Sequence, residues 1–181
     1  MKPLPFPLAL NIGTDIVHVP RITRLLQRTD YLRRFTRRIL SDQEHIDFRK
    51  RFQQTSQPQT PSHASSTQPT ITPEMTRWLA GRFAAKEAAR KAAPGGAAAL
   101  SWKDVVIRVP ELGDEGEGER VDVGVDGSTS RQQRQRQQDD GTSRRPEIVF
   151  LGDGMGQPDR LGRLSISHDG DYVVATVLAA G

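Results

Sequence analysis

Apolar residues recur at two different spacings along the chain, and these spacings predict four helices and five short strands. Helical spacing extends from Ile22 to about Phe52, interrupted by a capping box that Ser41 and Glu44 form. A long fourth helix is predicted over residues 72–93, between a Thr-Pro-Glu start and a Pro-Gly-Gly stop. Strands are predicted at residues 8–12, ending at Gly13, and at residues 105–109, 147–151, 164–168 and 172–178.

Together these elements predict an α+β fold in which a short antiparallel sheet packs against the long central helix. The last two strands flank an Asp-Gly turn and are expected to pair as a hairpin. Residues 53–73 are rich in Ser, Thr, Gln and Pro, and residues 113–146 are first acidic and then rich in Arg and Gln, so both are interpreted as disordered insertions. Residues 1–181 are therefore expected to form one domain that is interrupted twice.

The amino-acid composition of the chain narrows the possible site chemistry and the expected cellular compartment. Hydrophobic residues make up 35% of the chain, which is low for a compact domain and agrees with two unpacked insertions. The formal net charge of +4 favours an anionic partner. The absence of cysteine excludes disulfides and cysteine nucleophiles and predicts an intracellular protein. No apolar run approaches the about 20 residues that span a bilayer, so no membrane partner is expected, and residues 3–12 read as neither a signal nor a transit peptide.

Three short stretches carry candidate chemistry. Glu87 and Lys91 lie one turn apart on the long helix and share a face, where the simplest interpretation is an exposed ion pair. Asp15 follows a Gly-Thr pair at a predicted strand edge, and Ser167 and His168 lie in a predicted strand near the end of the chain. Taken singly, such residues more often serve turns and local hydrogen bonds than a site.

Taken jointly, the stretches GTDIV, RFAAKEAARKA and SISH, in this order, resemble the holo-acyl-carrier-protein synthase family of 4′-phosphopantetheinyl transferases, in a fungal-type form. The resemblance implies that family's fold. It also implies transfer of the phosphopantetheine arm from coenzyme A to a serine of an apo acyl carrier protein, which releases 3′,5′-ADP and requires Mg²⁺. A homotrimer with active sites between its subunits is implied as well.

Carried over onto matching positions, Asp15 and Glu87 are expected to hold Mg²⁺, and Lys91 to contact a phosphate oxygen from the same helix face. A Mg²⁺-bound water and Glu87 both remain candidates for the general base. A helical wheel places Ala80 and Ala84 beside Glu87 and Lys91, where small side chains are expected to let the pyrophosphate approach.

Arg82, Lys86 and Arg90 form a separate basic row on the same helix. The resemblance implies that Arg82 and Lys86, together with Lys91, bind coenzyme A. His168 is implied to contact the nucleotide end of the coenzyme, with Ser167 donating a hydrogen bond nearby.

The basic residues between positions 33 and 51 fit docking of an acidic carrier protein. The low-complexity insertions are typical of fungal elaboration, which makes a mitochondrial carrier the expected acceptor and the mitochondrial matrix or the cytoplasm the expected compartment.

The chain departs from the family pattern at His18, where a Glu is common, and at Gln157, where a Lys is common. Residues 159–164 also replace a strand and a helix of the family, so apolar strand surface is expected to be exposed. These departures leave open a catalytically impaired relative that still binds coenzyme A or carrier protein. A basic nucleic-acid-binding protein, suggested by the Arg/Gln-rich tract of residues 131–145, is the remaining alternative, although no nucleic-acid module supports it.

Overall fold

The computed structural model describes residues 8–52, 70–109, 145–152 and 156–181. Within them the chain forms four α-helices, one short 3₁₀ helix and five strands. In chain order they are β1 (Leu10–His18), α1 (Val19–Leu26), α2 (Tyr31–Ile39), α3 (Asp42–Phe52), α4 (Pro73–Ala92), η1 (Trp102–Asp104), β2 (Val105–Arg108), β3 (Glu147–Phe150), β4 (Arg160–Asp169) and β5 (Tyr172–Ala180).

The five strands form one sheet in the order β1-β5-β4-β3-β2, and every neighbouring pair is antiparallel. The predicted hairpin is confirmed as β4 and β5. The predicted break at Gly13 is wrong, because β1 pairs with β5 without interruption from Leu10 to His18. Asp15 therefore lies inside a strand, at an edge of the sheet.

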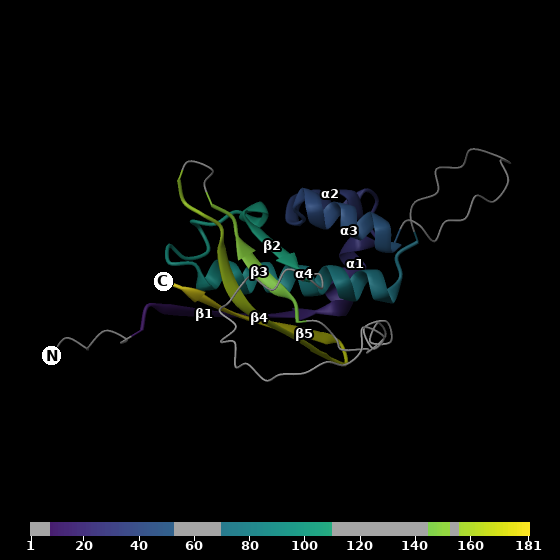
Figure 1. Cartoon of the computed structure of the whole chain (residues 1–181). Coiled ribbons are helices and arrows are strands. Elements are labelled where there is room, and N and C mark those ends of the chain that lie inside the picture. Colours follow the sequence, from purple (N-terminus) through teal and green to yellow (C-terminus); the bar gives the residue numbers. More distant parts are fainter. Residues whose placement is uncertain (1–7, 53–69, 110–144, 153–155) are drawn as a thin grey trace, which may run out of the picture.

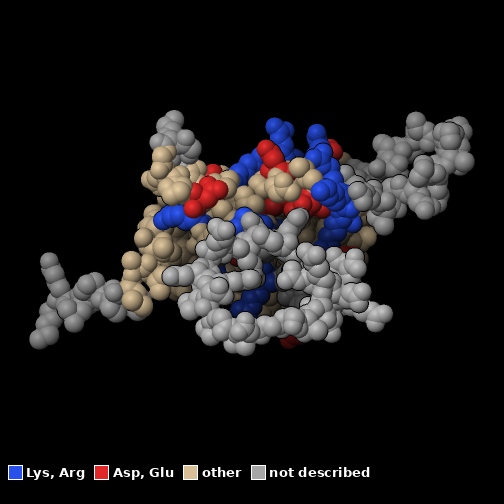
Figure 2. Space-filling view, in the orientation of Figure 1, with Lys and Arg blue, Asp and Glu red and all other residues tan. Residues whose placement is uncertain are grey.

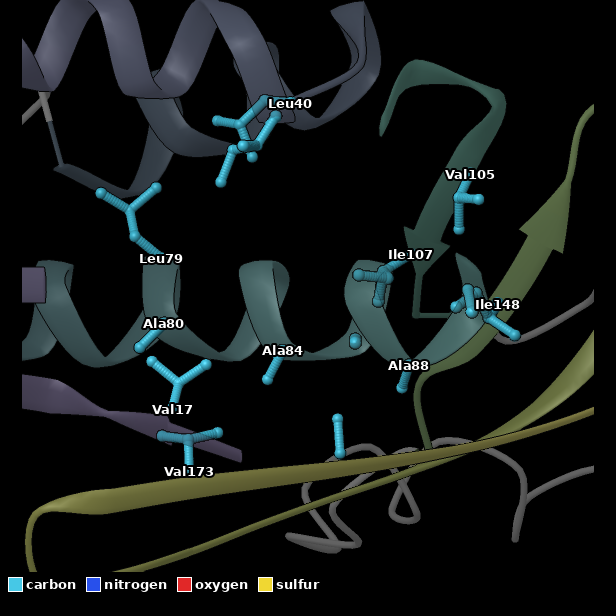
Figure 3. Close-up of a cluster of buried hydrophobic side chains, with 14 of the residues drawn as sticks. Val17, Leu40, Leu79, Ala80, Ala84, Ala88, Val105, Ile107, Ile148 and Val173 are labelled. Carbon is cyan, nitrogen blue, oxygen red and sulfur yellow. The ribbon is translucent and has the colours of Figure 1, made fainter. Parts of the chain in front are cut away.

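Helix α4 runs between the sheet and the group of α1, α2 and α3 (Figure 1). Its alanines are fully buried, and Figure 3 shows Ala80, Ala84 and Ala88 on the side of the helix that faces the strands, with Val17 and Val173 below Ala80. The expectation that alanines give a pyrophosphate access to the helix is thus wrong for Ala80 and Ala84. They are small because the sheet packs close to the helix axis, and they belong to the hydrophobic core.

The helix starts agree with the sequence prediction. Glu44 accepts a hydrogen bond from the Ser41 amide at 2.9 Å and donates its own amide to the Ser41 hydroxyl at 3.3 Å, which completes the capping box. At the start of α4, the Thr72 hydroxyl accepts from the Met75 amide at 3.1 Å, and Pro73 occupies the first helical position. The long helix ends at Ala92, one residue before the prediction.

The predicted insertions lie mainly outside the described residues. Of the first, residues 70–73 are described: residues 70 and 71 have no regular structure, Thr72 is the N-cap of α4, and Pro73 is its first residue. Of the second, residues 145 and 146 are described and have no regular structure.

The sheet face away from α4 carries apolar side chains that are exposed, which agrees with the expectation of exposed apolar strand surface. Ile12, Ile16 and Leu161 are 68%, 62% and 61% exposed. We call this face the outer sheet face. According to the strand register, its exposed apolar side chains are Leu10, Ile12, Ile16, Leu161, Tyr172 and Leu178. No helix in the described part of the chain is long and apolar enough to cross a membrane.

Gly13 sets the distance between β1 and α4. A Cβ atom at this position would meet the Ala88 carbonyl oxygen at 2.0 Å and the Ala92 nitrogen at 2.7 Å, both backbone atoms that cannot move aside. We therefore expect Gly13→Ala to lower the free energy of unfolding by about 2 kcal/mol, as overpacking of a core does. Urea denaturation followed by circular dichroism measures this.

Gly81 offers a matched control for that substitution. A Cβ atom there would lie 4.0 Å from the Ile166 side chain, which is an ordinary contact, and the residue is in the interior of α4. Because alanine favours a helix, Gly81→Ala is expected to raise the free energy of unfolding by about 0.5 kcal/mol. Equal effects of the two substitutions would contradict the close approach of β1 to α4.

Candidate active site

Asp15 lies beside α4 because β1 runs antiparallel to that helix. Gly13 touches the backbone near the end of α4, whereas Val17 lies below Ala80 (Figure 3). A strand advances about 3.3 Å per residue and a helix about 1.5 Å. Asp15, two residues after Gly13, therefore lies about one helical turn closer to the start of α4 than Gly13 does. Asp15 is thereby level with Glu87.

Asp15 and Lys91 are in direct contact. The Lys91 ammonium lies 2.8 Å from Asp15 Oδ1 and donates to the Thr14 carbonyl oxygen at 2.9 Å. The Lys91 side chain is 47% exposed, whereas that of Asp15 is 17% exposed. An ammonium has three donors, so a third remains for a solvent-side acceptor.

Glu87 does not pair with Lys91, which excludes the simple interpretation of an ion pair one turn apart. Its Oε1 instead lies 3.0 Å from Arg90 Nη1, and both side chains are about one-fifth exposed. The sequence thus correctly placed Glu87 and Lys91 on one helix face, but each has a partner that the spacing did not indicate.

The basic row of α4 faces the segment of residues 97–107 rather than solvent. Arg82 donates to the Ile107 carbonyl oxygen at 2.9 Å, and Lys86 donates to those of Trp102 and Val105 at 2.9 and 2.6 Å. Arg90 also donates to carbonyl oxygens of this segment. These hydrogen bonds therefore hold residues 97–107 against α4.

The assignment of Lys86 to coenzyme A is wrong, because its side chain is fully buried. Its ammonium lies 2.6 Å from Glu44 Oε2, and Glu44 is equally buried and accepts the Ile107 amide at 3.3 Å. The pKa of Lys86 is lowered, since burial penalises the ammonium more than Glu44 stabilises it. All of its donors are used inside the protein.

Arg82 is half-buried, with its guanidinium carbon 4.6 Å from the centroid of the Trp78 ring. Burial lowers the pKa of Arg82, while Glu44 and Asp47 act in the opposite direction. Its predicted contact with coenzyme A stays a prediction.

Ser167 and His168 point to opposite faces of the sheet, because successive strand residues alternate. His168 is opposite Val173, on the face that packs against α4, and Ser167 is opposite Val174, on the outer sheet face. His168 shares its face with Asp15, but β5 separates their strands by roughly 10 Å. Within this chain, Ser167 and His168 therefore do not face a common point.

A cleft of about 540 Å³ opens beside Glu87, between α1, α2, α4 and η1. Its base is apolar and aromatic, and four arginines surround it. We call it the arginine cleft, after Arg21, Arg34, Arg38 and Arg90. In Figure 2, Lys and Arg side chains gather over α2 and α3, in the upper right of the view. The cleft therefore presents positive charge next to one candidate metal ligand.

Sequence reasoning included Arg34 and Arg38 in a broad basic stretch but missed the cleft. Their spacing of four residues indicates one shared helix face. Arg21 gave no such signal, because only the packing of α1 against α2 brings it to the same cleft.

The described residues contain no cluster of three or more His, Cys, Asp or Glu side chains that could hold a metal ion. Asp15 and Glu87 are two carboxylates at one level of α4, and both are partly exposed. Mg²⁺ is commonly held by one or two carboxylates together with substrate phosphate oxygens and water, so this pair fits that ion.

Comparison with known proteins finds the following relatives. Residues 11–117 match the 4′-phosphopantetheinyl transferase superfamily. A mitochondrial 4′-phosphopantetheinyl transferase B of Aspergillus fumigatus is 55% identical over 186 residues, which cover 100% of both chains. A holo-[acyl-carrier-protein] synthase of Gloeobacter violaceus is 29% identical over 177 residues, 94% of this chain and 92% of the relative.

Solved structures agree with the predicted α+β fold. A holo-(acyl-carrier-protein) synthase of Bacillus anthracis in complex with coenzyme A (3′,5′-ADP) superposes with a TM-score of 0.51 at 22% identity, over 93% of this chain and 94% of the other. The fold is thereby confirmed.

Proposed function

The chain belongs to the 4′-phosphopantetheinyl transferase superfamily, and from this premise we propose that it transfers phosphopantetheine from coenzyme A to a serine of an apo acyl carrier protein. The relatives at 55% and 29% identity support this reaction by their names. The observation that carries it is the position of Glu87 and Lys91 on one face of α4, where Lys91 contacts Asp15 of β1 and Glu87 lines a cleft surrounded by arginines.

In the proposed reaction, the serine oxygen forms a bond to the phosphorus that carries the pantetheine arm. The pyrophosphate P–O bond breaks, 3′,5′-ADP leaves, and the hydroxyl proton passes to a base. We expect Lys91 to donate its third N–H to a phosphate oxygen, because the Asp15 carboxylate and the Thr14 carbonyl accept the other two. Asp15 in turn fixes the Lys91 ammonium at the site.

Asp15 and Glu87 are the residues that would hold Mg²⁺, and they are a hard oxygen donor set that suits this ion. When bound, Mg²⁺ neutralises charge that develops on the pyrophosphate. Glu87 Oε2 accepts no hydrogen bond within the described residues, so it is the oxygen that Glu87 would offer to the ion. Glu87 and a water held at the site both remain candidates for accepting the serine proton.

Mass spectrometry of the acceptor tests the function. The full chain is incubated with coenzyme A, Mg²⁺ and several apo carrier proteins, including a mitochondrial one, and the expected result is addition of the phosphopantetheine arm to the carrier. Chelation of Mg²⁺ with EDTA is expected to stop the addition. A folded sample that binds coenzyme A but modifies no carrier would favour the impaired relative. The Aspergillus relative is named as mitochondrial, which supports the mitochondrion as the compartment.

Arg82, Ser167 and His168 remain proposed contacts of coenzyme A. If Arg82 meets the 3′-phosphate, Arg82→Ala raises the KM for coenzyme A more than the KM for 3′-dephospho-coenzyme A. Equal changes in the two KM values would remove that role from Arg82.

A homotrimer is part of the proposal, and the apolar outer sheet face supports it. Its exposed side chains are of the kind that a partner subunit covers. Ser167 lies on this face, so a site between subunits would place it near a neighbouring chain. Sedimentation equilibrium of the purified chain measures its oligomeric state, and a monomer at micromolar concentration would contradict the trimer.

The arginine cleft is the proposed docking site of the acidic carrier protein. Reversing the charge of Arg34 and Arg38 together is expected to raise the KM for the carrier about tenfold and to leave kcat nearly unchanged, because attraction outside the reacting atoms mainly affects encounter. Steady-state kinetics with varied carrier concentration measure both constants.

Arg33 and Arg37 provide the matched control, since they lie on the same helix but line a separate groove between α2 and α3. Their reversal changes the net charge by the same amount and is expected to raise the KM for the carrier less than about threefold at physiological salt, where screening is strong over about 8 Å. Equal effects of the two double variants would place docking elsewhere.

A further inference from the structure

Arg90 is built into the protein by all three nitrogens of its guanidinium. Nε donates to the Leu100 carbonyl oxygen at 2.8 Å, Nη2 to that of Ala97 at 2.6 Å, and Nη1 to Glu87 Oε1 at 3.0 Å. The guanidinium carbon also lies 5.0 Å from the centroid of the Trp102 ring. Arg90 is thus a fixed donor that lines the cleft and already has protein partners on three sides.

This arrangement holds one oxygen of Glu87 and leaves the other available. In the described part of the chain, Oε2 of Glu87 accepts no hydrogen bond from the protein. A free glutamate side chain would sample several rotamers, and each binding event would have to select one of them. With Oε1 held by a rigid donor, the carboxylate keeps one orientation on the helix face that it shares with Lys91, the partner of Asp15.

We propose that Arg90 is a positioning residue, which orients the Glu87 carboxylate toward a divalent cation shared with Asp15. The proposal rests on the proposed function, because it takes Glu87 as a metal ligand. Groups that hydrogen-bond to a metal ligand typically raise metal affinity by 10- to 100-fold, and Arg90 stands in that relation to Glu87. The opposite effect of Arg90 has an equally clear physical basis. A guanidinium that only competes with the metal ion for Glu87 would weaken metal binding.

Metal affinity distinguishes the two roles without measuring turnover. Mn²⁺ is titrated into the full chain saturated with coenzyme A, and free Mn²⁺ is followed by electron paramagnetic resonance, with coenzyme alone as the blank. Arg90→Ala is expected to raise the Kd for Mn²⁺ about tenfold. Arg90→Lys keeps the charge but loses the planar fork, and is expected to resemble Arg90→Ala. An unchanged or lower Kd in Arg90→Ala would overturn the proposal.

Arg77→Ala is the control for loss of a positive charge from α4, since Arg77 is exposed on that helix, and its Kd for Mn²⁺ is expected to equal that of the unmodified chain. Melting temperatures of all variants are measured without metal or coenzyme. They show how much of any change reflects loss of folded protein.

Glu87→Gln separates the positioning role from the proposed function. If this variant binds Mn²⁺ as tightly as the unmodified chain, the metal assignment itself fails. If Glu87→Gln weakens binding but Arg90→Ala does not, only the positioning role fails. Under the proposal, adding Arg90→Ala to Glu87→Gln changes the Kd no further, whereas a purely structural role of Arg90 would weaken binding equally in both backgrounds.

Discussion

Replacing Glu87 with glutamine is expected to slow phosphopantetheine transfer by about a hundred- to a thousandfold, the usual cost of removing a group that stabilises developing charge. The amide has the same shape as the carboxylate, and its oxygen can still accept from Arg90, which holds Glu87 Oε1 at 3.0 Å. The fold is therefore expected to persist while the negative charge is lost. Single-turnover transfer to an apo carrier, followed by mass spectrometry, measures the rate.

Glu74 supplies the control for this substitution. It is a glutamate of the same helix, it is largely exposed, and it pairs at 2.9 Å with Arg51; neither residue lines the cleft. Glu74→Gln is expected to keep the full transfer rate and nearly the full stability, because exposed ion pairs contribute little. If Glu87→Gln transferred as fast as Glu74→Gln, Glu87 would have no role in metal binding or in proton transfer.

Replacing Lys86 with methionine is expected to lower the free energy of unfolding by about 3 kcal/mol at neutral pH, since it leaves the buried Glu44 carboxylate without its counter-charge. The carbonyl oxygens of Trp102 and Val105 also lose their donor. Urea denaturation measures the change.

The exposed pair of Arg51 and Glu74 again gives the comparison, because Arg51→Met is expected to change the free energy of unfolding by less than about 0.5 kcal/mol. Adding Glu44→Gln to Lys86→Met removes the unpaired buried charge, and this double variant is expected to be more stable than Lys86→Met alone. A Lys86→Met variant as stable as Arg51→Met would show that the buried pair is not formed in solution.

Lys86 also makes a pH-dependent contribution. Its pKa in the folded state is lowered from 10.5, mainly by burial, so between the folded and unfolded values the unfolded chain binds more protons. The contribution of this group to stability is therefore fully present above pH 10.5 and is lost as the pH falls through the lowered pKa. Lys86→Met is expected to flatten the pH profile of stability in that interval.

Local signals in the sequence were sufficient wherever the structure depends on neighbouring residues. Ser41 and Glu44 cap α3 as predicted, Thr72 caps α4, and the Asp-Gly turn joins β4 and β5. Each of these features is decided within a few residues of the chain, by hydrogen bonds that the residue types themselves specify.

Long-range packing decided the features that the sequence prediction missed. Gly13 looked like the end of a strand, but β1 continues because the missing side chain makes room for the α4 backbone. Lys86 looked like a coenzyme ligand, but α3 and the residue 97–107 segment bury it against Glu44. The sequence shows how far apart two residues are along the chain, but not which side chains from distant segments pack against them.

The sequence by itself determined the family pattern and the helix face that Glu87 and Lys91 share, because a helix fixes which of its own residues are neighbours. Only the tertiary structure decided that Lys91 pairs with Asp15, that Arg90 holds Glu87, and that arginines of α1 and α2 surround the same cleft. The physical reason is that these contacts join segments far apart along the chain. Their distances are set by the packing of β1, α1 and α2 around one alanine-rich helix.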